Sequence, residues 1–67
     1  MRISYDKLWM LIQQNEMNKQ ALSKAANISA NTVTKLGKNE PVSMDVLLRI
    51  CKVFHCDIGD VMEVIEG

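Results

Sequence analysis

The sequence predicts a compact all-α domain of five short helices. Its 67 residues suffice for one domain, and 48% of them are hydrophobic, which allows a packed core. In five segments apolar residues recur at the three- and four-residue spacing of amphipathic helices, each after a capping residue. With one proline, three glycines and no low-complexity run, residues 1–67 are expected to form a single ordered domain.

Each expected helix starts after a residue type that favours a helix N-terminus. The helices are expected over residues 5–15, 19–26, 30–36 and 44–55, with a fifth beginning after Asp57. The expected N-caps are Ser4, Asn18, Ser29, Ser43 and Asp57. Asp57 and Asp60 have the spacing of a capping box, and helical apolar spacing continues after them as far as Ile65. Residues 1–4 and 63–66 also alternate weakly, so a short ribbon between the chain ends remains an alternative.

The two cysteines, Cys51 and Cys56, belong to no CxxC motif. Without a recognisable signal peptide or an apolar run near the ~20 residues of a membrane span, a cytoplasmic chain with free thiols is expected. Cys51 lies on the apolar stripe of the fourth helix, which favours a buried side chain over a metal site with His55 and Cys56. No nucleophile–base pair or glycine-rich phosphate loop is recognisable, so no enzyme, cofactor or small-molecule ligand is expected.

The charges are segregated along the chain although they cancel overall. Residues 1–16 are neutral, and residues 39–67 carry six acids against two basic residues. Between them, residues 17–38 hold no acid and four lysines: Lys19, Lys24, Lys35 and Lys38. A domain with charge segregated in this way can bind a polyanion on its basic face and repel it from its acidic face. The alternative is that both faces are simply solvated surfaces that differ in charge and have no binding role.

The short second and third helices are joined at a tight corner, residues 27–29. Asn27 tolerates the left-handed backbone conformation that such a corner needs. Ser23 and Ala26 are small where the two helices must cross, and Ile28 supplies an apolar plug after the turn. These are the requirements of a helix-turn-helix.

The third helix is expected to turn a polar face outward. Val33 and Leu36 are three residues apart and define its buried side. At about 100° per residue, the opposite side carries Asn31, Thr34 and Lys35. Amide, hydroxyl and ammonium groups bind base edges in the major groove, and Ala30 at the N-terminal end could contact a thymine methyl group. The pattern therefore favours a DNA-reading helix.

Two long segments resemble the phage repressor and Cro family of bacterial regulators, also called the xenobiotic-response-element family. Residues 17–40, MNKQALSKAANISANTVTKLGKNE, look like the helix-turn-helix of that family. Residues 43–62, SMDVLLRICKVFHCDIGDVM, are similar to its fourth and fifth helices. The chain departs from the family in having Asn27 and Glu16 where glycine is common, and Lys19 where glutamine is common.

The resemblance implies a repressor-like transcriptional regulator that binds double-stranded DNA sequence-specifically, with the third helix in the major groove. The residues implied to face base edges are Ala30, Asn31, Thr34 and Lys35. Those implied to contact phosphates are Asn18, Lys19, Lys38 and Asn39. A helical protein-interaction module, or an antitoxin-like partner protein on the same fold, is the alternative function.

The chain holds more apolar side chains than so small a core needs. They include five methionines and also Ile3, Trp9, Ile12, Leu48 and Val64. Trp9, the only tryptophan, is expected in the core or in a subunit contact. The surplus predicts a homodimer that buries the fifth helix and the chain ends.

Overall fold

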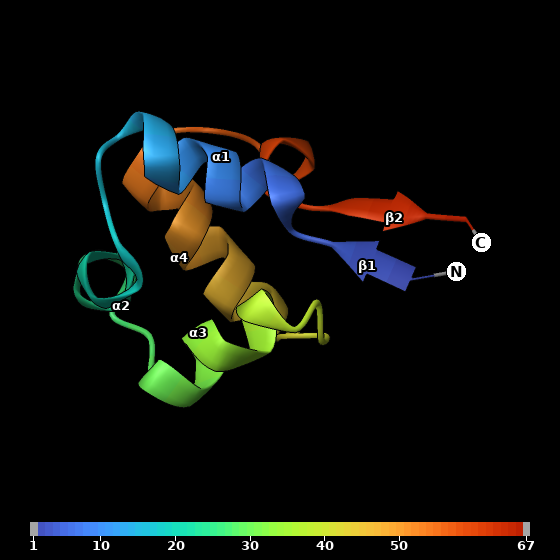
Figure 1. Cartoon of the computed structure of the whole chain (residues 1–67), viewed down its shortest axis with the longest axis horizontal. Coiled ribbons are helices and arrows are strands. Elements are labelled where there is room, and N and C mark those ends of the chain that lie inside the picture. Colours follow the sequence, from blue (N-terminus) through green and yellow to red (C-terminus); the bar gives the residue numbers. More distant parts are fainter. Residues whose placement is uncertain (1, 67) are drawn as a thin grey trace.

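Four α-helices and a short terminal ribbon make up residues 2–66, the part of the chain that this computed structural model describes (Figure 1). In order, the elements are β1 (Arg2–Ser4), α1 (Asp6–Gln14), α2 (Lys19–Ala26), α3 (Ala30–Gly37), α4 (Met44–Phe54), the 3₁₀ helix η1 (Ile58–Asp60) and β2 (Glu63–Ile65). The strands β1 and β2 lie side by side at the opposite end of the long axis from α2.

A single core joins the four α-helices. Its largest fully buried side chains are Tyr5, Leu8, Leu22, Leu36, Ile50 and Val61. Ile12 is also buried, with only 6% of its surface exposed, so it belongs to the core and not to the surplus that the sequence predicted. Within residues 2–66, the large apolar side chains that do lie on the surface are Met10, Met44, Leu48 and Val64.

Side-chain caps fix the starts of α2, α3 and α4. Asn18, Ser29 and Ser43 each accept a hydrogen bond from a backbone N–H in the first turn, as predicted. The helix ends differ from the predicted ones by one residue at most. Ser4 is not the N-cap of α1, because its backbone belongs to β1; Tyr5 takes that position, and Ser4 Oγ accepts from Asp6 N at 3.3 Å.

The predicted fifth helix is wrong, and the domain is mostly helical, with four α-helices and a small ribbon of two three-residue strands. Asp57 and Asp60 do form the predicted capping box, but the helix stops after the single turn of η1. Residues Glu63–Ile65 continue as β2, antiparallel to β1, with Ile3 opposite Val64. A one-turn helix has few internal hydrogen bonds, whereas β-branched residues suit a strand whose backbone groups find partners in β1. The ribbon left open as an alternative is therefore present within the described residues.

Tyr5 ties the loop after α3 to the start of α1. Its backbone N–H donates to Asn39 Oδ1 at 3.2 Å, and its hydroxyl donates to the Glu40 carbonyl at 2.9 Å. The side chain is fully buried, and this burial raises the pKa of Tyr5 above its ordinary value. The position of the loop that carries Lys38 and Asn39 is thus set by a core residue.

Candidate nucleic-acid interface

The corner between α2 and α3 has the left-handed geometry that the sequence predicts. Asn27 lies at φ 55° and ψ 50°, and Ile28 is 8% exposed, as expected of the plug. Ser23 adds a contact that its small size alone does not predict, because its hydroxyl donates to the Ile28 carbonyl at 2.6 Å. The corner is therefore fixed from within α2, which sets the direction in which α3 leaves.

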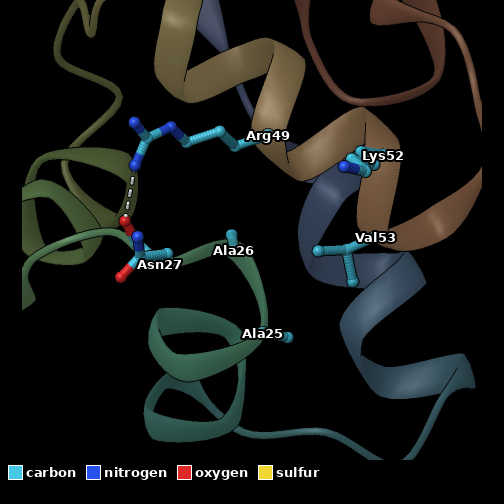
Figure 2. Close-up of a pocket in the computed structure, with 6 residues that line it drawn as sticks. All are labelled: Ala25, Ala26, Asn27, Arg49, Lys52 and Val53. Carbon is cyan, nitrogen blue, oxygen red and sulfur yellow. Dashed lines mark hydrogen bonds between the residues drawn. The ribbon is translucent and has the colours of Figure 1, made fainter.

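Arg49 holds the same corner from α4. Its Nη1 donates to the Asn27 carbonyl at 2.9 Å (Figure 2), while its Nε lies 3.0 Å from Asp45 Oδ2. Beside this contact is an open pocket of about 400 Å³ lined by Ala25, Ala26, Asn27, Arg49, Lys52 and Val53. Sequence reasoning missed Arg49: its spacing from Asp45 signals an ion pair along α4, but nothing local indicates the carbonyl across the fold.

The outer face of α3 carries the four predicted base-reading residues. Ala30, Asn31, Thr34 and Lys35 are all exposed, and Val33 and Leu36 are buried on the opposite side. The Thr34 hydroxyl donates to the Ala30 carbonyl at 3.0 Å. Thr34 therefore offers its methyl group and acceptor lone pairs, but no free hydroxyl proton.

Both predicted phosphate-binding asparagines use their side-chain oxygen within the fold. Asn18 Oδ1 accepts from Ala21 N at 2.7 Å at the start of α2, and Asn39 Oδ1 accepts from Tyr5 N. Each keeps its NH₂ group, which is the half of the amide that can donate to a phosphate oxygen. Lys38, at the end of α3, is exposed.

Lys19 belongs to α2, and its side chain reaches residues of both α1 and α3. Its Nζ is 5.6 Å from the centre of the Trp9 ring on α1 and 3.8 Å from the place that a Cβ on Gly37 would occupy. Trp9 itself is half-buried and packs against the core, one of the two places predicted for it. The ammonium group therefore lies beside the end of α3, where Lys38 follows.

A hollow of about 290 Å³ separates α2 from α3 on this side. It is lined by Lys19, Gln20, Ser23, Ala30, Val33 and Thr34. The hollow brings the predicted base-reading residues Ala30 and Thr34 together with Lys19, which was predicted to bind phosphate. The other five predicted site residues do not line it. Gln20 and Ser23 were not predicted as site residues. Their spacing of one helical turn along α2 is the only local signal that they share a face.

The lysines of residues 17–38 keep their charge unpaired. Across residues 2–66 the ion pairs are Lys7 with Glu63 and Arg49 with Asp45, and neither involves a lysine of this segment.

Cys51 and Cys56 are free thiols. Burial of Cys56 and, to a lesser extent, the proximity of Cys51 raise the pKa of the Cys56 thiol. No cluster of three candidate metal ligands occurs in the described part of the chain. Within the same residues, every helix is too short or too polar to cross a bilayer.

Two short helices joined at a left-handed corner, the second with a polar outer face, define a helix-turn-helix DNA-binding domain. The chain belongs to the family of Cro/C1-type HTH DNA-binding domains, whose model matches residues 7–67. The fold is similar to the crystal structure of transcriptional regulator VanUg, form II, with a TM-score of 0.92 and 47% sequence identity over 98% of this chain and 88% of that one. No curated protein gives a match.

Proposed function

We propose that this chain is a transcriptional repressor that binds double-stranded DNA sequence-specifically as a homodimer. The observation that carries the proposal is the exposed polar face of α3 within a segment, residues 17–38, that has four lysines and no acid. The likeness to a solved transcriptional regulator and the family's DNA-binding domain support the same reading. The repressor role rests on the resemblance to phage repressors, and a reporter gene behind the bound site tests it.

In this proposal α3 enters the major groove and its outer face reads bases. Asn31 has an amide that can form two hydrogen bonds with one adenine, and Lys35 can donate to guanine or to a phosphate. Ala30 and Thr34 present methyl groups to the base edges. Asn31 and Lys35 are both exposed, and Lys35 has no ion-pair partner within residues 2–66, so it does not have to break a salt bridge to reach DNA.

The second part of the proposal is a set of phosphate contacts around α3. Asn18 and Asn39 donate through their side-chain NH₂ groups, and Lys19 and Lys38 add positive charge beside the end of the helix. The N-terminus of α2 supports the contact at Asn18, because free backbone N–H groups there favour an anion. Such contacts fix the register on the duplex without selecting a sequence.

The dimer in this proposal forms through the terminal ribbon. Val64 on β2 is 62% exposed, although it is a large apolar residue in a strand. Burying it against a second copy would remove this apolar surface from water. A two-fold dimer would present two copies of α3, and two half-sites about one turn of DNA apart would then be required.

Selection of bound duplexes from a random-sequence library tests the proposal directly. The expected result is a near-palindrome with half-site centres about 10 bp apart. Two results together would overturn the proposed function and favour the protein-interaction alternative: a library in which no sequence is enriched, and heparin binding whose strength does not change with salt concentration.

Three substitutions separate base reading from phosphate binding. Asn31→Ala is expected to weaken binding to the selected duplex by about 1–3 kcal/mol and to change binding to a scrambled duplex little. Lys38→Ala is expected to weaken both alike and to reduce the log–log salt slope by about 1 per subunit. Lys24→Ala is the matched control, an exposed lysine of the same segment without a proposed contact. If Asn31→Ala weakens both duplexes equally, α3 does not read bases through Asn31.

A further inference from the structure

The hollow between α2 and α3 has an apolar interior on a surface otherwise rich in lysine. Val33, only 5% exposed, contributes to its lining, and Ala30 and Thr34 line it from the exposed side of α3. We propose that this hollow receives the 5-methyl group of a thymine and thereby selects a 5-methylpyrimidine at one position of each half-site. The inference rests on the proposed DNA-binding function and adds to it a specificity site that includes α2.

The hydroxyl groups that line the hollow are already engaged. Ser23 Oγ donates to the Ile28 carbonyl at 2.6 Å, and Thr34 Oγ1 donates to the Ala30 carbonyl at 3.0 Å. Each hydroxyl has one proton, so neither can donate to a base. The walls therefore offer apolar surface and acceptor lone pairs, and a guest that accepts hydrogen bonds, such as a base carbonyl or ring nitrogen, would lose its hydrogen bonds to water without replacement from these two hydroxyls.

The long side chains at the rim leave the interior open. Lys19 lines the hollow, but its Nζ is held near the Trp9 ring, 5.6 Å from the ring centre. Gln20 is exposed one residue further along α2. The rim thus carries positive charge and an amide, which suit a phosphate and a base edge, around an interior that suits an apolar group.

DNA supplies one apolar group that matches this interior. On the major-groove edges of the four base pairs, the methyl group of thymine is the only hydrocarbon substituent, and cytosine presents a hydrogen atom at the same ring position. The surrounding segment, residues 17–38, has no acid that would repel the duplex. A thymine methyl group is therefore the occupant that fits both the charge of the rim and the chemistry of the walls.

Replacement of thymine by deoxyuridine, which removes only the methyl group, is the decisive experiment. The probe is a duplex selected from the random library, with each thymine of one half-site replaced singly. At one position the affinity is expected to fall about fourfold, equivalent to ~0.8 kcal/mol for one buried methyl-sized group. A cytosine at that position should bind weakly, and 5-methylcytosine should restore about the same factor of four.

A protein variant that fills the hollow locates the methyl group. Ala30→Leu adds bulk at an exposed lining residue, so its affinities for the thymine and deoxyuridine duplexes are expected to become equal. Ala25→Leu is the matched control, because Ala25 is exposed on α2 but lines the pocket beside Arg49 and not the hollow; it should keep the fourfold ratio.

The outcomes distinguish the inference from the function on which it rests. Specific binding that is unchanged by deoxyuridine at every position overturns the inference and leaves the function standing. A fourfold loss that persists in Ala30→Leu places the methyl group elsewhere and overturns it as well. Failure of the wild-type chain to bind any selected duplex overturns the proposed function itself.

Discussion

Glu16→Gly is expected to stabilise the chain. Glu16 lies at φ 55° just before α2, in the left-handed region that a non-glycine residue adopts at a cost. Its side chain is exposed and has no ion-pair partner within residues 2–66, so removing it loses little packing or pairing. The substitution therefore isolates the backbone contribution of one turn.

The expected size follows from two opposing terms. A left-handed conformation costs an L-residue about 1–2 kcal/mol, and glycine is free of this cost. Glycine also gives the unfolded chain more conformational freedom, which offsets about 0.5–1 kcal/mol. The net gain is about 0.5–1 kcal/mol in the free energy of unfolding, and for a domain of this size it raises the melting temperature by about 2–8 °C.

Thermal melts of four proteins test this reasoning. Wild type is compared with Glu16→Gly and with Glu16→Ala, which removes the same charge but keeps the strained backbone. Glu40→Gly is the positional control, because Glu40 is exposed and has no positive φ, so glycine there should only add freedom to the unfolded chain. The reasoning is refuted if Glu16→Gly melts no higher than Glu16→Ala.

Three further perturbations have defined outcomes. At the corner, Asn27→Gly should be neutral or stabilising and Asn27→Val destabilising by about 1–2 kcal/mol in thermal melts, because φ is 55° there; equal melting would place the strain elsewhere. Tyr5 is the only tyrosine, so tyrosinate absorbance should titrate at a higher pH in the folded chain than in urea. Because the pKa of Tyr5 is higher in the folded chain than in the unfolded chain, the stability that Tyr5 contributes is complete below about pH 10 and is lost as the pH rises through the folded-state pKa. Tyr5→Phe should therefore reduce the fall in stability at high pH. Val64→Lys should shift sedimentation from dimer to monomer at tens of micromolar, whereas Leu48→Lys, on α4, should not; the opposite pattern would move the interface to α4.

Local signals in the sequence predicted the helix-turn-helix well. The bounds of α2 and its cap at Asn18 were predicted to the residue, and the left-handed turn was assigned to Asn27. Cap residues and the spacing of apolar side chains depend on neighbours within one or two turns, so they can be read locally. The same reasoning put Asn31 and Lys35 on the exposed face of α3, while their contacts with DNA stay predictions.

Features that depend on distant partners were missed or, like the terminal ribbon, left open as an alternative. The segment after η1 has apolar residues at helical spacing, but its backbone pairs with Arg2–Ser4 at the other end of the chain. Arg49 reaches the Asn27 carbonyl, and Asn39 reaches Tyr5 N, across the fold. Such contacts become visible only when the helices are placed in space.

The contact between Lys19 and Trp9 gives the chain a built-in optical signal. Trp9 is the only tryptophan, and Lys19 Nζ lies 5.6 Å from the centre of its ring. Indole fluorescence depends on nearby charges because the excited state is more polar than the ground state. A phosphate that draws this ammonium group away from the ring would shift the emission, so binding at Lys19 can be followed by the light of a single native residue without any added dye.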